Sequence, residues 1–351
     1  MKYHVNPNIK NTPRIFPRQG RTDYYRYDAN ENPEGLPKEF VDSVLKEITP
    51  EYVAMYPEPN RFLKKYADFI GTSFENVYAT NGSDHGIRVI LETFGEPGKD
   101  VVTVSPTFEI YWVCCKLLGL NHKPVQYDSN LTITIDKILD AITFDTRIVV
   151  LLNPNSPIGN LYSEEDVNRI ILRAKEVGAV VVLDEAYHYF YEKTFLPFAL
   201  NNENVILLRT FSKLMSLAGC RIGVVIGSPE IIGYVKNSRL AYEMNSIGLL
   251  FAEKLLDRCD IIENLIQSEK EGKAYLIEQL TDRHYWFMDC HGNYVLIKPK
   301  NEAHWVSEKL EEKKILVHPY GNELMKDMIR VTTGSKKMME IFANVFFEVD
   351  K

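Results

Sequence analysis

The stretch VILLRTFSKLMSLAGCRIGVVIG, residues Val205–Gly227, contains two apolar runs joined by a short polar segment. The first run is rich in β-branched and aliphatic residues and predicts a buried strand, which Ser212 and Lys213 follow. Arg221 opens the second run. The pattern therefore brings a serine, a lysine and an arginine to the edge of a buried sheet. A Ser-Lys pair alone is more often an exposed loop, so its context decides the interpretation.

Lysine forms Schiff bases with carbonyls, and pyridoxal 5′-phosphate (PLP) carries an aldehyde together with a phosphate. A second predicted strand in AVVVLDEAYHYF, Ala179–Phe190, ends at Asp184. Because open α/β sheets bind ligands outside the carboxyl ends of their strands, Asp184 and Lys213 are expected to face one crevice. A carboxylate there would keep a pyridine nitrogen protonated, and Tyr187 would donate to the ring's phenolic oxygen. The alternative for an Asp-Glu pair is a helix N-cap with an acidic first turn.

Two upstream segments also run from a predicted strand into a polar turn. Arg147–Asn160, RIVVLLNPNSPIGN, enters an Asn/Pro/Gly turn that cannot continue a sheet ladder. Asn76–Arg88, NVYATNGSDHGIR, passes from a short strand into a helical pattern, and the free N–H groups at a helix start bind phosphate. The chain contains no G-x-G-x-x-G fingerprint, which argues against a dinucleotide site.

These four segments, in this order, resemble the fold-type I PLP enzymes and specifically the histidinol-phosphate aminotransferase family. Further family-like signatures are YDANENP (27–33), YPEP (56–59), SPTFEIY (105–111), GNY (292–294) and IRVTTG (329–334). The resemblance covers most of the chain. It implies a PLP-dependent aminotransferase of amino-acid biosynthesis, which moves an amino group between a donor such as glutamate and a small anionic, phosphorylated substrate. It also implies a homodimer with an active site shared between the subunits.

The resemblance assigns roles to residues of this sequence. Lys213 would hold PLP as a Schiff base and transfer protons, with Asp184 and Tyr187 as its catalytic partners. Tyr111, in preference to Phe108, would stack on the pyridine ring, although either aromatic could also be core packing. The expected cofactor contacts are Gly82, Ser83, Asp84, Tyr111, Asn155, Ser156, Asp184, Tyr187, Ser212, Lys213, Arg221 and Tyr56, the last from the partner subunit.

The sequence departs from the family pattern at two positions. Ser156 stands where the family has an asparagine that contacts the ring's phenolic oxygen, which leaves this contact to Asn155, Asn153 or Tyr187. His318 stands where a second arginine commonly binds the substrate phosphate. A histidine is only partly charged near neutral pH, and this puts histidinol phosphate in doubt as the substrate. The expected substrate contacts are Arg330, His318, Tyr27 and Asn32.

Strands alternate with helical stretches between about residues 50 and 235, which predicts a mostly parallel α/β sheet covered on both faces. We expect an N-terminal arm with part of the small domain (1–48), a large PLP-binding domain (49–235) and a smaller α+β domain (236–351). The predicted strands are Val77–Thr80, Val101–Val104, His122–Gln126, Ile148–Leu152, Val180–Leu183, Val205–Leu208 and Ile222–Ile226. Predicted helices cover Ser163–Val177 and, as one long segment, Pro229–Leu280. Two short strands follow, near Trp286–Asp289 and Tyr294–Lys298.

The composition limits the possible partners. The 351 residues carry 41 Lys and Arg against 48 Asp and Glu, a net charge of −7 without like-charge runs, so neither nucleic acid nor a membrane surface is expected as a partner. The N-terminus lacks the apolar region of a signal peptide, and we expect a cytoplasmic protein. Five scattered cysteines and eight histidines show no metal-ligand spacing, so we expect no metal.

Two other functions compete with transamination. A decarboxylase of a phosphorylated amino acid would use the same lysine and aspartate on the same scaffold, because the bond that breaks depends on substrate pose. A non-enzymatic binding protein is disfavoured, since Lys213, Asp184, Tyr187 and Arg221 are all present.

Overall fold

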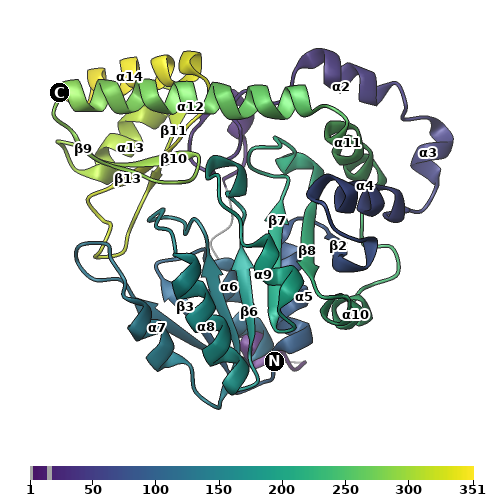
Figure 1. The fold of residues 1–351 in the computed structure, drawn as a ribbon. Coiled ribbons are helices and arrows are strands. Elements are labelled where there is room, and N and C mark those ends of the chain that lie inside the picture. Colours follow the sequence, from purple (N-terminus) through teal and green to yellow (C-terminus); the bar gives the residue numbers. More distant parts are fainter. Residues whose placement is uncertain (1–2, 14–17) are drawn as a thin grey trace.

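A computed structural model describes residues 3–13 and 18–351 of the chain. Its largest sheet has seven strands in the order β2-β8-β7-β6-β5-β3-β4 (Figure 1). The strands are β2 (Val77–Thr80), β3 (Asp100–Ser105), β4 (Asn121–Gln126), β5 (Thr146–Leu152), β6 (Val180–Asp184), β7 (Val205–Thr210) and β8 (Gly223–Gly227). Only β8 in this sheet runs antiparallel to its neighbours. All seven predicted strands are confirmed, with ends within about two residues, and so is the α/β fold class.

Alternate side chains of the central strands enter two different cores, as the two-residue period of a strand requires. On β6, Val181 and Leu183 pack with α8 (Glu164–Glu176), while Val182 lies in the core that includes α5 (Ser83–Phe94). The predicted start of α8 is confirmed: the Ser163 side chain accepts a hydrogen bond from the Asp166 N–H at 3.1 Å. The other helices around this sheet are α4 (Asn60–Ile70), α6 (Ile110–Leu118), α7 (Ile135–Ala141) and α9 (Leu196–Asn201).

A second, antiparallel sheet has four strands in the order β12-β13-β10-β9. These strands are β9 (Trp286–Asp289), β10 (Tyr294–Lys298), β12 (His318–Pro319) and β13 (Ile329–Thr332). Strands β10 and β13 share a third core with α12 (Cys259–Asp282), α13 (Ala303–Glu312) and α14 (Lys336–Val349). Near the N-terminus, β1 (Tyr25–Arg26) pairs in parallel with β11 (Ile315–Leu316), so this segment attaches to the C-terminal part of the chain. The domain boundaries at residues 48 and 235 stay a prediction.

The predicted continuous helix over Pro229–Leu280 is wrong. Three helices occupy this range: α10 (Pro229–Asn237), α11 (Ser246–Leu256) and α12 (Cys259–Asp282). The break before α11 follows from Asn245, whose side chain accepts from the Gly248 N–H and donates to the Cys220 carbonyl at 2.8 Å. An N-cap of this kind begins a new helix and cannot lie inside an old one.

The long helix α12 extends from the side of α11 to the four-stranded sheet, where it lies beside α14 (Figure 1). The remaining helices are α1 (Pro7–Lys10), α2 (Lys38–Leu45) and α3 (Pro50–Ala54). Within the described part of the chain, no helix has the length and apolar character needed to cross a membrane.

Candidate active site

The residues after neighbouring strand ends meet at one edge of the large sheet. Asp184 ends β6 and Lys213 follows β7, and these two strands are adjacent and parallel. The Lys213 Nζ atom lies 5.7 Å from the centre of the Tyr187 ring and donates a hydrogen bond to the Ala29 carbonyl at 2.9 Å. The structure therefore brings the three predicted catalytic residues to the same edge.

Donors for a phosphate converge at the start of α5. The Arg221 guanidinium lies 3.3 Å from Ser212 Oγ and 3.2 Å from Asp84 Oδ2. No side chain of the described residues caps α5, so its first-turn N–H groups beside Ser83 are available. A Cβ atom on Gly82 would come within 2.3 Å of Arg221 Nη2, so only glycine leaves room for the guanidinium there. A helix N-terminus, a hydroxyl and an arginine form a donor set that fits the phosphate of PLP.

Asp184 is buried, with 3 % of its surface exposed, and forms no ion pair with a described lysine or arginine. Its two oxygens accept hydrogen bonds from the Ala186 N–H at 3.0 Å and the Tyr111 hydroxyl at 2.8 Å. Burial raises its pKa to about 6, although these two hydrogen bonds oppose the shift. A buried carboxylate without a cationic partner fits a protonated ring nitrogen. The hydrogen bond from Tyr111 was not predicted, and its stacking on the ring stays a prediction.

Tyr187 is held by polar neighbours. Asn30 Nδ2 donates to the Tyr187 hydroxyl oxygen at 2.9 Å, and Ser156 stabilises the ionised phenol by hydrogen bonding. Burial alone would raise the pKa of Tyr187, but the positive charges of Lys213 and Arg330 outweigh it and lower the pKa. A phenol with a lowered pKa is a stronger hydrogen-bond donor, so the Tyr187 hydroxyl is suited to donate to the phenolic oxygen of the cofactor ring. Asn30 was not predicted as a site residue from the sequence. It lies in the YDANENP segment, and its φ of 54° is a left-handed conformation that asparagine tolerates.

The predicted contact of Asn155 with the cofactor is contradicted. Its Oδ1 accepts from the Thr107 hydroxyl at 2.7 Å, and its Nδ2 donates to the Pro106 carbonyl and the Tyr127 hydroxyl at 3.1 Å. The amide is fully buried, and both its oxygen and its nitrogen are engaged by the segment after β3 and by Tyr127. Asn153 likewise accepts from the Tyr162 N–H at 3.0 Å. Ser156 is therefore the turn residue that remains beside Tyr187.

Arg330 lies on β13 with an incomplete set of partners. Its Nη2 donates to the Asp28 carbonyl at 2.7 Å, and its guanidinium lies 5.8 Å from the centre of the Tyr294 ring. The Nε atom is buried and has no hydrogen-bond partner in the described structure, where Arg330 also forms no ion pair. A buried guanidinium donor without an acceptor indicates a site for a carboxylate or phosphate.

His318 pairs with Arg330 across β12 and β13, and its side chain is exposed to solvent. Desolvation of the ring and the positive charge of Arg330 lower the pKa of His318 to about 4, although Asp28 opposes this shift. This lowered pKa favours the neutral imidazole near neutral pH in the ligand-free protein.

Tyr27 does not reach the site. It is fully buried, its hydroxyl donates to the Met338 carbonyl at 2.8 Å, and its ring packs edge-to-face on Phe342. This placement in the third core contradicts the predicted substrate contact.

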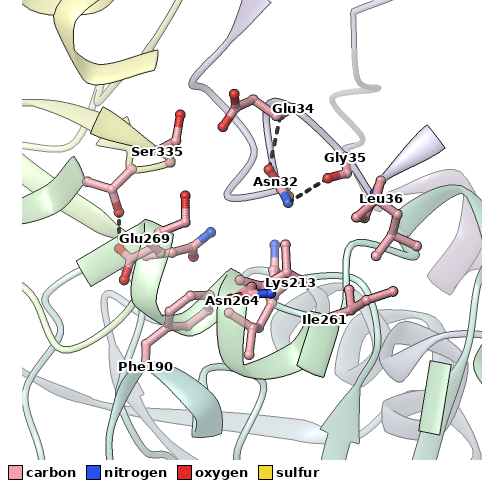
Figure 2. A pocket seen from close by; sticks show the side chains of 17 residues that line it. Asn32, Glu34, Gly35, Leu36, Phe190, Lys213, Ile261, Asn264, Glu269 and Ser335 are labelled. Atoms are coloured by element: carbon pink, nitrogen blue, oxygen red, sulfur yellow. Dashed lines mark hydrogen bonds between the residues drawn. The ribbon is translucent and has the colours of Figure 1, made fainter. Parts of the chain in front are cut away.

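Asn32, in contrast, lines a cavity of about 400 Å³ together with Lys213 (Figure 2). Its Nδ2 donates to Ser216 Oγ at 2.7 Å.

Tyr56 lies on the surface with 71 % of its area exposed and stacks on Tyr242 at 4.0 Å between ring centres. The substrate contact of Asn32 and the cofactor contact of Tyr56 both stay predictions.

The fold and the site together define a PLP-dependent enzyme of fold type I. The family model of class I and II aminotransferases matches residues 24–346, and the chain belongs to this family, whose cofactor is PLP. It is 30 % identical to a histidinol-phosphate aminotransferase of Caldanaerobacter subterraneus subsp. tengcongensis over 331 residues, 93 % of each chain. A Clostridium novyi protein of the same name is 29 % identical over 328 residues, 92 % of this chain and 91 % of that protein.

Solved structures share the fold. The Sinorhizobium meliloti histidinol-phosphate aminotransferase in complex with PLP aligns with a TM-score of 0.87 and 23 % identity, covering 98 % of this chain and 97 % of that one. A Thermus thermophilus aspartate aminotransferase variant aligns with a TM-score of 0.81 and 17 % identity, covering 99 % and 100 %. The chain is therefore an enzyme of the transaminase type, and these comparisons give the decarboxylase alternative no support.

Proposed function

We propose that this aminotransferase moves an amino group between an amino acid such as glutamate and a small carbonyl compound that carries one phosphate or carboxylate. The observation that supports this most directly is the unpartnered, buried Nε of Arg330, which lies on the strand next to the neutral His318. One fixed positive charge suits one anionic group. Both half-reactions would use it in turn, because the amino donor leaves before the acceptor binds.

Each site residue has a role in this reaction. PLP, when bound, supplies an electron sink for the charge that develops at the substrate Cα. Lys213 Nζ would remove the Cα proton of the substrate as a general base and deliver a proton to C4′ of the cofactor as a general acid. The Asp184 carboxylate would hold the proton of the pyridine nitrogen, and the Tyr187 hydroxyl would hydrogen-bond the ring's phenolic oxygen. Ser212, Arg221 and the first turn of α5 bind the phosphate.

The same proposal includes a homodimer in which Tyr56 of the partner subunit contacts the cofactor phosphate. The exposed Tyr56 and Tyr242 support it, because they lie among other exposed apolar side chains on nearby segments of the chain. These include Val53, Met55 and Leu240, with exposed fractions of 63 %, 57 % and 74 %. Contiguous apolar surface of this kind is typical of protein interfaces.

The function is tested by adding glutamate to the purified holoenzyme and recording the cofactor absorbance. We expect a change from the lysine-bound to the aminated form, reversed by a keto acid. Borohydride reduction should fix the cofactor on the tryptic peptide that contains Lys213, and Lys213→Ala should reduce turnover by orders of magnitude while the exposed control Lys46→Ala does not. Release of carbon dioxide without amination, or an adduct on another lysine, would overturn the proposal.

A further inference from the structure

A cavity beside Lys213 contains two side chains, Glu269 and Asn293, to which the proposed transamination assigns no role. The cavity of about 400 Å³ lies between α12, the segment after Asn32, the loop after β13 and the stem of Lys213 (Figure 2). Arg330 is not among the residues that line it: Arg330 donates to the Asp28 carbonyl, whereas Asn32 of the same segment lines the cavity. The cavity therefore shares Lys213 and Asn32 with the proposed active site, but Arg330 and His318 do not line it.

The cavity wall contains a buried carboxylate, Glu269 of α12, with 8 % of its surface exposed. Helix α12 lies very close to the loop after β13, because a Cβ atom on Gly272 would be only 1.9 Å from the Gly334 carbonyl oxygen. This close contact places Glu269, on the preceding turn of the helix, beside the loop. Glu269 Oε1 accepts a hydrogen bond from the Thr333 hydroxyl. Burying a carboxylate with so few partners is unfavourable, because charges inside proteins are ordinarily paired.

The nearby lysines do not pair with Glu269 in the described structure. Lys273 Nζ lies 2.7 Å from Asp289 Oδ1 and donates to two carbonyls of the following loop, and Lys270 lies 3.9 Å from Glu192. Both lysines act on the Glu269 carboxyl only through their charge, while Asp289 opposes them. Burial raises the pKa of the Glu269 carboxyl despite these two lysines, and no described side chain forms an ion pair with it.

A second acceptor on the cavity wall also lacks a partner. Asn293 is 2 % exposed and donates from Nδ2 to the Asn30 carbonyl at 3.1 Å, but its Oδ1 has no hydrogen-bond partner in the described part of the chain. Glu34 adds another carboxylate, and Lys213 is the one cationic side chain among the lining residues. Lys213 is engaged by the Ala29 carbonyl and, in the holoenzyme, by the cofactor. The opposite wall is apolar and includes Leu36, Leu214, Ile261 and Leu265.

We propose that this cavity binds a small aliphatic cation with N–H donors, an alkylammonium or alkylguanidinium, whose charged end is held by Glu269 and Asn293. The carbon chain packs on the leucine and isoleucine side chains of the cavity wall. The requirement for donors follows from the two acceptors, and the requirement for charge follows from the unpaired carboxylate. The site lies beside Lys213 and binds its ligand whichever substrate the enzyme transaminates.

The test uses n-butylguanidinium and its neutral analogue n-butylurea, measured by calorimetry on the PLP-loaded enzyme. A guanidinium keeps its charge and does not react with an aldehyde as a primary amine does. We expect wild type to bind butylguanidinium about ten-fold or more tightly than butylurea. Glu269→Gln should abolish this preference, whereas Glu263→Gln, an exposed residue of the same helix, should keep it.

Equal affinities of wild type for the two compounds, or no binding of either, would overturn the proposal without any variant. An undiminished preference in Glu269→Gln would overturn it as well. Circular dichroism and the PLP content of each variant establish that the proteins compared are folded. Amino transfer from glutamate is measured separately, so failure of this site leaves the proposed function untouched.

Discussion

Asp184 is a residue whose protonation depends directly on the fold. Burial raises its pKa from 3.8 to about 6, so the folded PLP-free protein binds this proton more tightly than the unfolded chain does. The resulting contribution to stability is fully present below pH 3.8. It is lost as the pH rises through about 6, where the buried carboxyl must ionise without a cationic partner.

Asp184→Asn removes this titration. Relative to the variant, the PLP-free wild-type protein should lose about 2 kcal/mol of unfolding free energy between pH 4.5 and pH 7.5, since one pKa unit corresponds to about 1.4 kcal/mol and the folded-state pKa is about 6. Urea unfolding of both proteins at pH 4.5 and 7.5 measures the difference. The variant should also bind PLP more weakly, because it cannot hold the ring proton. A stability difference that does not change with pH would contradict the raised pKa.

His318 offers a second test. Because its pKa is lowered to about 4, the wild-type enzyme should show no change in substrate affinity from this residue between pH 6 and 8. His318→Arg places a second fixed charge beside Arg330 and should improve binding of phosphorylated substrates by about 1–3 kcal/mol. Michaelis constants measured across that pH range give both quantities. His4→Arg, at an exposed histidine, is the control and should change neither. Unchanged affinity in His318→Arg would exclude this residue from the anion pocket.

Single residues also show which parts of the site can be predicted from the sequence and which cannot. Lys213 and Asp184 were predictable because the carboxyl ends of adjacent parallel strands meet at one edge, so position along the chain implies position in space. Asn155 and Tyr27 were misassigned because sequence does not indicate which way a side chain points within a turn or at a strand end. Asn30 was missed because its partner, Tyr187, lies 157 residues away.

Among the elements, strands were predicted more reliably than the succession of helices after β8. A buried strand is a short apolar run with clear ends, whereas the boundary between α10 and α11 depends on one capping residue, Asn245. The approach of α5 to β8 could not be predicted either. A Cβ atom on Gly223 would lie 2.6 Å from the Gly82 carbonyl carbon and the Ser83 nitrogen, so this glycine sets the position of the phosphate-binding helix start.

Gly223→Ala should therefore shift the start of α5 and weaken PLP binding by about ten-fold or more, since overpacking costs about 1–3 kcal/mol. Fluorescence titration with PLP measures the affinity. The matched control is Gly233→Ala in α10, where an added Cβ meets nothing within 4 Å and the helix gains stability. If both variants bind PLP equally well, the close approach of β8 to α5 has no role in holding the phosphate.

At the scale of the whole molecule, the site draws on three distant parts of the chain. Lys213 follows a strand of the seven-stranded sheet, Arg330 lies on the four-stranded sheet, and Asn30 belongs to the N-terminal segment whose strand β1 pairs with β11. The cofactor residues and the anion pocket thus belong to different sheets, and the placement of one sheet against the other sets the distance between them. The exposed Tyr56 suggests that a second subunit contributes as well.

A shared active site makes a specific prediction for mixed dimers. Lys213→Ala and Tyr56→Ala should each be impaired as homodimers when PLP is limiting. In a mixed dimer, the subunit with Tyr56→Ala keeps its own Lys213 and receives an intact tyrosine from its partner. One of the two sites is then complete, so a statistical mixture should recover about a quarter of wild-type activity after subunit exchange.

The control mixture combines Lys213→Ala with Asp184→Asn. These two residues lie at the same edge of one subunit's sheet, so every site in the mixed dimer lacks one of them and no activity should return. Recovery with Tyr56→Ala but not with Asp184→Asn would locate the tyrosine's action across the interface. If neither mixture recovers, although sedimentation shows that subunits have exchanged, Tyr56 acts within its own chain or not at all. The shared site would then be wrong even for a protein that is a dimer.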